Sequence, residues 1–191
     1  MKKTILAAPL AALLLFSGCR KNNSPAPGDA SALYAGAQAT VTAEISVLAE
    51  YPADYGVSVE WTGDSASVEV TAPADVAGIR ATLSGESAEI TYDDAALECF
   101  LPSLTGYAPV DAVPRLLELV ASGTPEDWCR EEYGGEAALS LTYRDDFPSV
   151  TGLRRVWLRE SDLALLGAEL FLDDSLVLRV RCTAFALRAS E

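Results

Sequence analysis

The stretch VSVEWTGDSASVEVT, residues 57–71, decides the fold class of this chain. Its large apolar residues alternate with polar ones on both sides of a tight turn at 62–65: Val57, Val59, Trp61, Val68 and Val70. A period of two is typical of a β-strand with one buried and one solvated face. The stretch therefore predicts two antiparallel strands that face one core.

The same alternation recurs along most of the chain. It predicts further strands at 41–50, 79–83, 88–92, 97–101, 128–132, 137–143, 153–159, 163–172 and 175–187, about ten strands in all. One segment has helical spacing instead, because its apolar residues follow the pattern i, i+3, i+4 and i+7: Val113, Leu116, Leu117 and Val120. Asp111 is suited to begin this helix and Gly123 to end it.

One amphipathic helix is too narrow to cover such a sheet. A helix is about 10 Å wide, whereas ten strands about 4.8 Å apart span roughly 48 Å before the sheet curls. The rest of the apolar face needs a ligand, a partner or closure of the barrel, since large exposed apolar patches are unusual. The inward residues that would line this hollow are Val57, Val59, Trp61, Val68, Val70, Ile79, Ile90, Leu116, Leu117, Leu178 and Val180.

The amino-terminal residues form an export signal. Lys2 and Lys3 precede an apolar run at 5–16, which is shorter than the roughly 20 residues that span a bilayer. Ser17 and Gly18 then precede Cys19, and this sequence resembles the lipobox of bacterial lipoproteins. The resemblance implies cleavage after residue 18, a diacylglyceryl and acyl lipid on Cys19, and a location on the outer face of the cell membrane.

The remaining chain divides into a tether and one domain. Residues 19–36 are rich in Ser, Pro, Ala and Gly, which predicts a flexible tether. About 16 extended residues would reach roughly 50 Å at about 3.3 Å each. Residues 37–191 are long enough for a single domain with its own core.

Charge and cysteine content limit the function classes. Without Lys2 and Lys3, 12 basic and 28 acidic side chains leave a net charge of −16, which disfavours binding to nucleic acid and anionic headgroups. Cys99, Cys129 and Cys182 form either one disulfide with one free thiol or none, and the sequence does not choose. The chain has no histidine and no metal-ligand spacing of cysteines, so no metal site is predicted.

No catalytic motif occurs in the sequence, so we expect a protein that is not an enzyme. Arg155, Trp157 and Arg159 share one face of a predicted strand. This set is either an interaction patch, because Arg and Trp are frequent interface anchors, or a solvated face with charge partners on the neighbouring strands.

Three segments carry a family resemblance: 155–159 (RVWLR), 168–174 (AELFLDD) and 177–185 (VLRVRCTAF). Together with the order of predicted elements, they resemble the lipoprotein-localisation (LolA/LolB-like) family over roughly 37–188. The resemblance implies an unclosed antiparallel β-barrel with helices over its concave apolar side, a hollow that holds acyl chains in characterised members. A narrower resemblance is to GerS-type germination lipoproteins, which partner a cortex-processing amidase.

Two non-catalytic functions follow from this resemblance. The first is a membrane-anchored module that binds a lipid or lipid-linked molecule in its hollow. The second is an envelope lipoprotein that docks another protein, such as a spore-cortex amidase. The size of the hollow separates them, because inward side chains that fill it leave no room for an acyl chain.

Overall fold

The computed structural model describes residues 24–85, 87–93, 95–100 and 106–189. The predicted signal peptide at 1–18, the predicted lipidation site Cys19 and the side chain of Cys99 lie outside the described part. The described residues contain two helices, α1 (Pro27–Tyr34) and α2 (Ala112–Ser122). Six strands lie between them: β1 (Ala37–Val47), β2 (Ala53–Trp61), β3 (Ser65–Ala72), β4 (Arg80–Ser84), β5 (Ser87–Tyr92) and β6 (Ala95–Phe100). Five follow α2: β7 (Asp127–Tyr133), β8 (Glu136–Asp146), β9 (Thr151–Arg159), β10 (Leu165–Leu172) and β11 (Ser175–Ala189).

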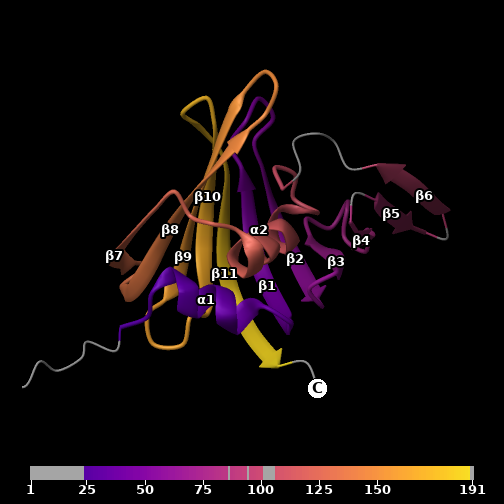
Figure 1. Ribbon diagram of the computed structural model, residues 1–191. Helices are drawn as coiled ribbons and strands as arrows, with labels where there is room; N and C mark the ends of the chain where they lie inside the picture. Colours follow the sequence, from indigo (N-terminus) through magenta and orange to yellow (C-terminus); the bar gives the residue numbers. More distant parts are fainter. Residues whose placement is uncertain (1–23, 86, 94, 101–105, 190–191) are drawn as a thin grey trace, which may run out of the picture.

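The strands form one antiparallel sheet in the order β6-β5-β4-β3-β2-β1-β11-β10-β9-β8-β7. Two meanders are therefore joined where the first strand pairs with the last, and β6 and β7 remain as edges. Figure 1 shows α1 and α2 over the concave face, with β5 and β6 reaching beyond them. The predicted fold class, an unclosed antiparallel β-barrel with a helix over its concave face, is confirmed.

The predicted helix is confirmed as α2, and its entry differs from the prediction in one detail. Asp111 occupies the N-cap position, but its carboxylate accepts no hydrogen bond from the helix. Instead it accepts from the backbone N–H groups of Gly106, at 2.7 Å, and Ala108, at 3.1 Å. Asp111 therefore fixes the segment that leads into α2.

The prediction of a flexible tether up to residue 36 is wrong for residues 27–34, which form α1. Pro27 is favourable in the first turn, and Asp29 accepts a hydrogen bond from the N–H of Ala26 at 2.8 Å. Ala30 and Tyr34 are fully buried. The composition of 19–36 resembles that of a linker, but these two buried side chains are enough to hold α1 against the rest of the protein.

The alternation of inward and outward side chains changes along β11. A simple alternation through Leu176, Leu178, Val180, Cys182 and Ala184 would turn all five inward, but Ala184 is exposed. The register against β1 shifts between Thr42 and Ala43. This bulge reverses the alternation, as an extra residue in one strand does, so Phe185 and Leu187 pack on the core instead.

Alternate strand ends meet at one end of the sheet, which we call the α1 rim. The registers that define it pair the start of β1 with the ends of β2 and β11, and the start of β3 with the end of β4: Ala39–Trp61, Ala37–Ala189 and Ser65–Ser84. The β2–β3, β4–β5 and β9–β10 turns therefore lie at this rim with α1 (Figure 1). The β1–β2, β3–β4 and β8–β9 turns lie at the opposite rim. In the described part of the chain, no helix has the length and hydropathy needed to cross a membrane.

Candidate functional site

The middle of the concave face is filled by protein. Most of the predicted hollow residues are at most 3% exposed there: Val57, Val59, Trp61, Val68, Val70, Leu116, Leu117, Leu178 and Val180. All of them except Val70 belong to one cluster of buried residues that joins the sheet to both helices. Small inward residues, including Ala39, Ala43 and Ala81, are also buried, so they admit the helices closely instead of leaving space. Protein side chains therefore fill the centre of the concave face, and a pocket opens at its margin beside Trp61.

The apolar face nevertheless continues past the helices toward β6. Cross-strand neighbours on this face form a continuous row from β2 to β6: Val59, Val68, Ala81, Ile90 and Leu97. Exposure is at most 1% for the first three, intermediate for Ile90, and 65% for Leu97. Ile79, just before β4, is also half-buried. We call the concave face of β4–β6 the open wing.

A pocket of about 220 Å³ opens between α2 and the α1-rim ends of β2–β4. Its apolar walls are Trp61, Ala66, Leu83 and Pro114, and Arg115 and Glu118 lie beside them. The Arg115 guanidinium contacts Glu118 at 2.6 Å and donates to the carbonyl oxygen of Gly85. Its buried Nε has no hydrogen-bond partner among the described residues. The pocket thus has largely apolar walls with one ion pair beside them.

A second pocket, of about 310 Å³, opens at the same rim between α1, the β9–β10 turn and the end of β11. Its lining is apolar except for one carboxylate: Leu33, Asp162, Ala164, Phe185, Leu187 and Ala189. This pocket was not predicted from the sequence, because α1 and the bulge in β11 both create it. Pro27 followed by Asp29, typical of a helix start, was the available signal for α1.

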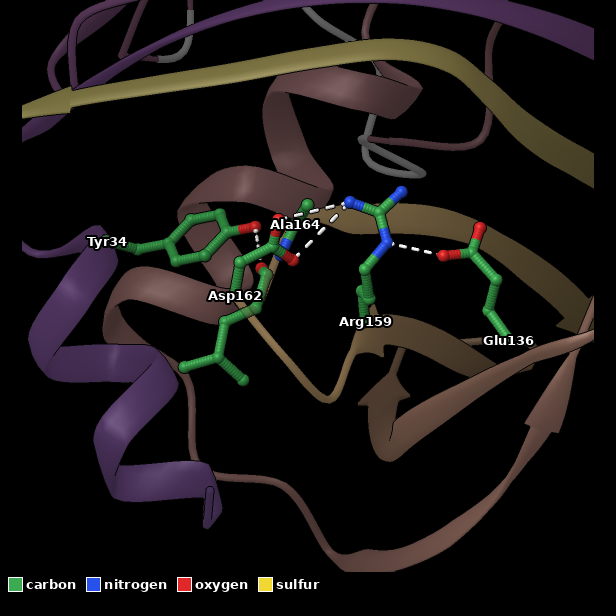
Figure 2. Close-up of polar contacts among 6 residues, drawn as sticks. Tyr34, Glu136, Arg159, Asp162 and Ala164 are labelled. Carbon is green, nitrogen blue, oxygen red and sulfur yellow. Dashed lines mark hydrogen bonds and ion pairs between the residues drawn. The ribbon is translucent and has the colours of Figure 1, made fainter. Parts of the chain in front are cut away.

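Figure 2 shows the polar contacts that fix α1 to the β9–β10 turn. The Tyr34 hydroxyl donates to the carbonyl oxygen of Leu163 at 2.9 Å. Asp162 accepts from the backbone N–H of Ala164 and from Arg159, each at 3.1 Å, and Arg159 contacts Glu136 at 2.5 Å. The turn is therefore braced by α1 and by the end of β9.

Arg155, Trp157 and Arg159 lie together on the convex face of β9, opposite the pockets. Trp157 is only 6% exposed, because its ring stacks on Tyr133 at 4.4 Å and its Nε1 donates to Glu131 at 2.7 Å. Arg159 is paired with Glu136 and Asp162. Arg155 is exposed, with its guanidinium 6.0 Å from the centroid of Trp157. Of the three, only Arg155 offers a charged group to a partner.

Cys129 and Cys182 carry free thiols. Among the described residues, no three carboxylates or thiols are grouped so as to hold a metal ion. Burial raises the pKa of the Cys182 thiol to about 12. It also raises the pKa of the Tyr107 hydroxyl to about 12. Both groups are thus held in their neutral forms by the fold.

These two shifts predict a loss of stability in alkali. The unfolded chain releases the Cys182 proton above about pH 9, whereas the folded protein retains it up to about pH 12. Stability is therefore present below pH 9 and falls as the pH rises toward 12, by up to about 1.4 kcal/mol per pH unit. Urea midpoints at pH 7, 9 and 10.5 measure this. Cys182→Ala should reduce the fall, and Cys129→Ala, which removes an exposed thiol, should not.

No family model matches the sequence, and no curated protein matches it. Solved structures do match. An uncharacterised conserved protein from Thermus thermophilus has a TM-score of 0.55 at 9% identity, covering 86% of this chain and 87% of that one. A lipoprotein-sorting protein domain from Vibrio parahaemolyticus has 0.46 at 10% identity, covering 86% and 92%. A LolA superfamily protein from Nitrosomonas europaea has 0.39 at 14% identity, covering 86% and 91%. The Thermus structure supports the fold alone.

Proposed function

We propose that this chain is a membrane-anchored, non-catalytic lipoprotein of the cell envelope that binds the apolar chain of a lipid or lipid-linked molecule. The observation that carries the proposal is the exposed end of the concave face, where Ile90 and Leu97 continue the buried row of β2–β4. An apolar sheet surface that extends beyond the helices packed on it is suited to binding a ligand. The lipobox-like sequence at Cys19 supports export and anchoring on the outer face of the membrane.

The ligand is proposed to enter the pocket beside Trp61 and to continue along the open wing. The pocket's 220 Å³ is smaller than the roughly 300–1,000 Å³ of sites for drug-sized ligands. It therefore suits one end of a single chain rather than a ring system.

Tryptophan fluorescence tests this proposal. In an unlipidated Cys19→Ser protein that also carries Trp128→Phe and Trp157→Phe, Trp61 is the only emitter. A fatty acid brominated near its methyl end should quench Trp61 saturably. In the companion protein that keeps only Trp157, on the convex face, it should not quench. Leu97→Gln should weaken binding about tenfold, because it makes the open wing polar.

Glu98→Gln is the matched control, since it changes the opposite face of the same strand, where Glu98 is exposed. Its affinity should equal that of the parent. Absence of Trp61 quenching at every chain length, or equal quenching of Trp157, would refute the lipid-binding function.

A second candidate function is favoured by Arg155. Within the described residues it has no acidic partner, unlike Arg159 beside it. An exposed arginine next to an aromatic ring is a frequent interface anchor. We therefore retain as the alternative a protein-interaction lipoprotein, such as a GerS-type partner of a spore-cortex amidase, that docks an acidic group of its partner on the convex face.

A further inference from the structure

We propose that the α1 rim lies against the outer leaflet of the anchoring membrane, with Leu33 and its neighbouring pocket in contact with lipid chains. This proposal rests on the anchorage at Cys19 in the proposed function. It assigns an orientation to the domain and a lipid-facing role to the second pocket.

The first argument is the short reach of the chain before the domain. Arg130 on β7 donates from Nη2 to the carbonyl oxygens of Ser24, at 3.2 Å, and Pro25, at 3.0 Å. Its Nε lies 3.0 Å from Glu160 in the β9–β10 turn. The chain is thus fastened at the α1 rim from Ser24 onward. Five residue steps back to Cys19 span at most about 17 Å, instead of the roughly 50 Å expected from the sequence.

The second argument is that α1 is held in place. Its Ser31 hydroxyl donates to the carbonyl oxygen of Val120 in α2 at 3.1 Å. Tyr34 is fully buried, donates to Leu163, and lies 6.0 Å from Phe185 between ring centroids. Figure 2 shows Tyr34 directed into the β9–β10 turn. Lengthening the tether by detaching α1 would break these contacts, so the anchor keeps the rim close to the membrane.

The third argument is that the α1 rim exposes apolar surface. Leu33 is 43% exposed and borders the 310 Å³ pocket, whose lining is apolar except for Asp162. The Trp61 pocket opens at the same rim. Acidic side chains on the rim, such as Asp162 and Asp64, repel anionic headgroups, but only over about 8 Å at physiological ionic strength. A chain from the leaflet can therefore reach either pocket without crossing much water.

Photo-crosslinking of the full-length lipidated protein tests this orientation. The protein is reconstituted on phosphatidylcholine vesicles that contain a phosphatidylcholine with a diazirine on its acyl chain. After irradiation, mass spectrometry maps the lipid adducts. We expect at least ten times more adducts on residues 27–36 and 185–189 than on 48–52 and 147–150 at the opposite rim.

A matched pair of variants sharpens the test, because Leu33 and Leu48 are 43% and 42% exposed and lie at opposite rims. Leu33→Glu should reduce adducts on 27–36 at least fivefold, and Leu48→Glu should leave them unchanged. Vesicle-bound protein with equal adducts on both rims, or none on the α1 rim, overturns the proposed orientation and leaves the anchor standing. Flotation that survives Cys19→Ala overturns the anchor and the orientation together, whereas the Trp61 measurement is independent of both.

Discussion

The double substitution Leu116→Asp and Leu117→Asp is expected to unfold the domain. Both leucines are fully buried between α2 and the concave face. Two carboxylates there would lose their hydration without any cation to pair with, and each such ion costs several kcal/mol. Ordinary domains have only about 5–15 kcal/mol of total stability. Circular dichroism should show loss of cooperative unfolding, and Ser122→Asp, an exposed change on the same helix, should remain folded.

Truncating either leucine alone should also destabilise the domain, but less than the double substitution does. Leu116→Ala and Leu117→Ala should each lower the free energy of unfolding by about 2–5 kcal/mol, because each leaves a cavity under α2. Glu118→Ala, on the exposed side of the helix, should change it by about 0.5 kcal/mol or less. Urea denaturation measures all three. Midpoints unchanged by both leucine truncations would mean that α2 does not seal the hollow, and the central cavity would again be available to a ligand.

The sequence predicted the strands and α2 well because their periodicity is local. In 57–71 every second side chain has the same environment, so the alternation alone gives the inward face. The same reasoning failed at Ala184, because a bulge in β11 depends on how that strand pairs with β1. It also failed at α1, whose burial depends on only two residues, Ala30 and Tyr34, in a segment with the composition of a linker.

The candidate site was less predictable than the fold. Alternation shows that Val59 and Ile90 point to the same side, but not that α2 covers Val59 and leaves Ile90 half-exposed. The position of α2 on the sheet determines this difference in exposure. Arg115 was not predicted as part of the site, because nothing in the spacing of α2 shows that its guanidinium reaches Gly85 in the β4–β5 turn.

A buried arginine at the opposite rim was also not predicted, although the alternation in β9 indicates it. Arg155, Trp157 and Arg159 share the convex face of β9, so Arg154 must share the concave face with Val156 and Leu158. Its side chain is 7% exposed, and its Nε lies 2.6 Å from Asp145. A charged residue on the inward face of a predicted strand is informative, because buried charges are almost always paired.

Arg154→Met is expected to lower the free energy of unfolding by about 3–5 kcal/mol, because removing one member of a buried ion pair leaves the other uncompensated. Arg154 also stacks at 4.9 Å on Tyr107, whose hydroxyl donates to Asp145 at 3.1 Å. Asp111 holds the same segment, and burial raises the pKa of its carboxyl. The substitution should therefore also loosen the entry to α2, visible as faster hydrogen exchange at residues 106–112.

Arg144→Met is the matched control, because this arginine on the adjacent strand forms an exposed pair with Glu126. Its loss should cost no more than about 1 kcal/mol. In the double variant Arg154→Met with Asp145→Asn, the cost should be smaller than the sum of the two single costs, by about 0.5–3 kcal/mol. Strictly additive costs, with exchange at 106–112 unchanged, would show that Arg154 does not connect β9 to the segment before α2. The position of that helix would then depend on its apolar face alone.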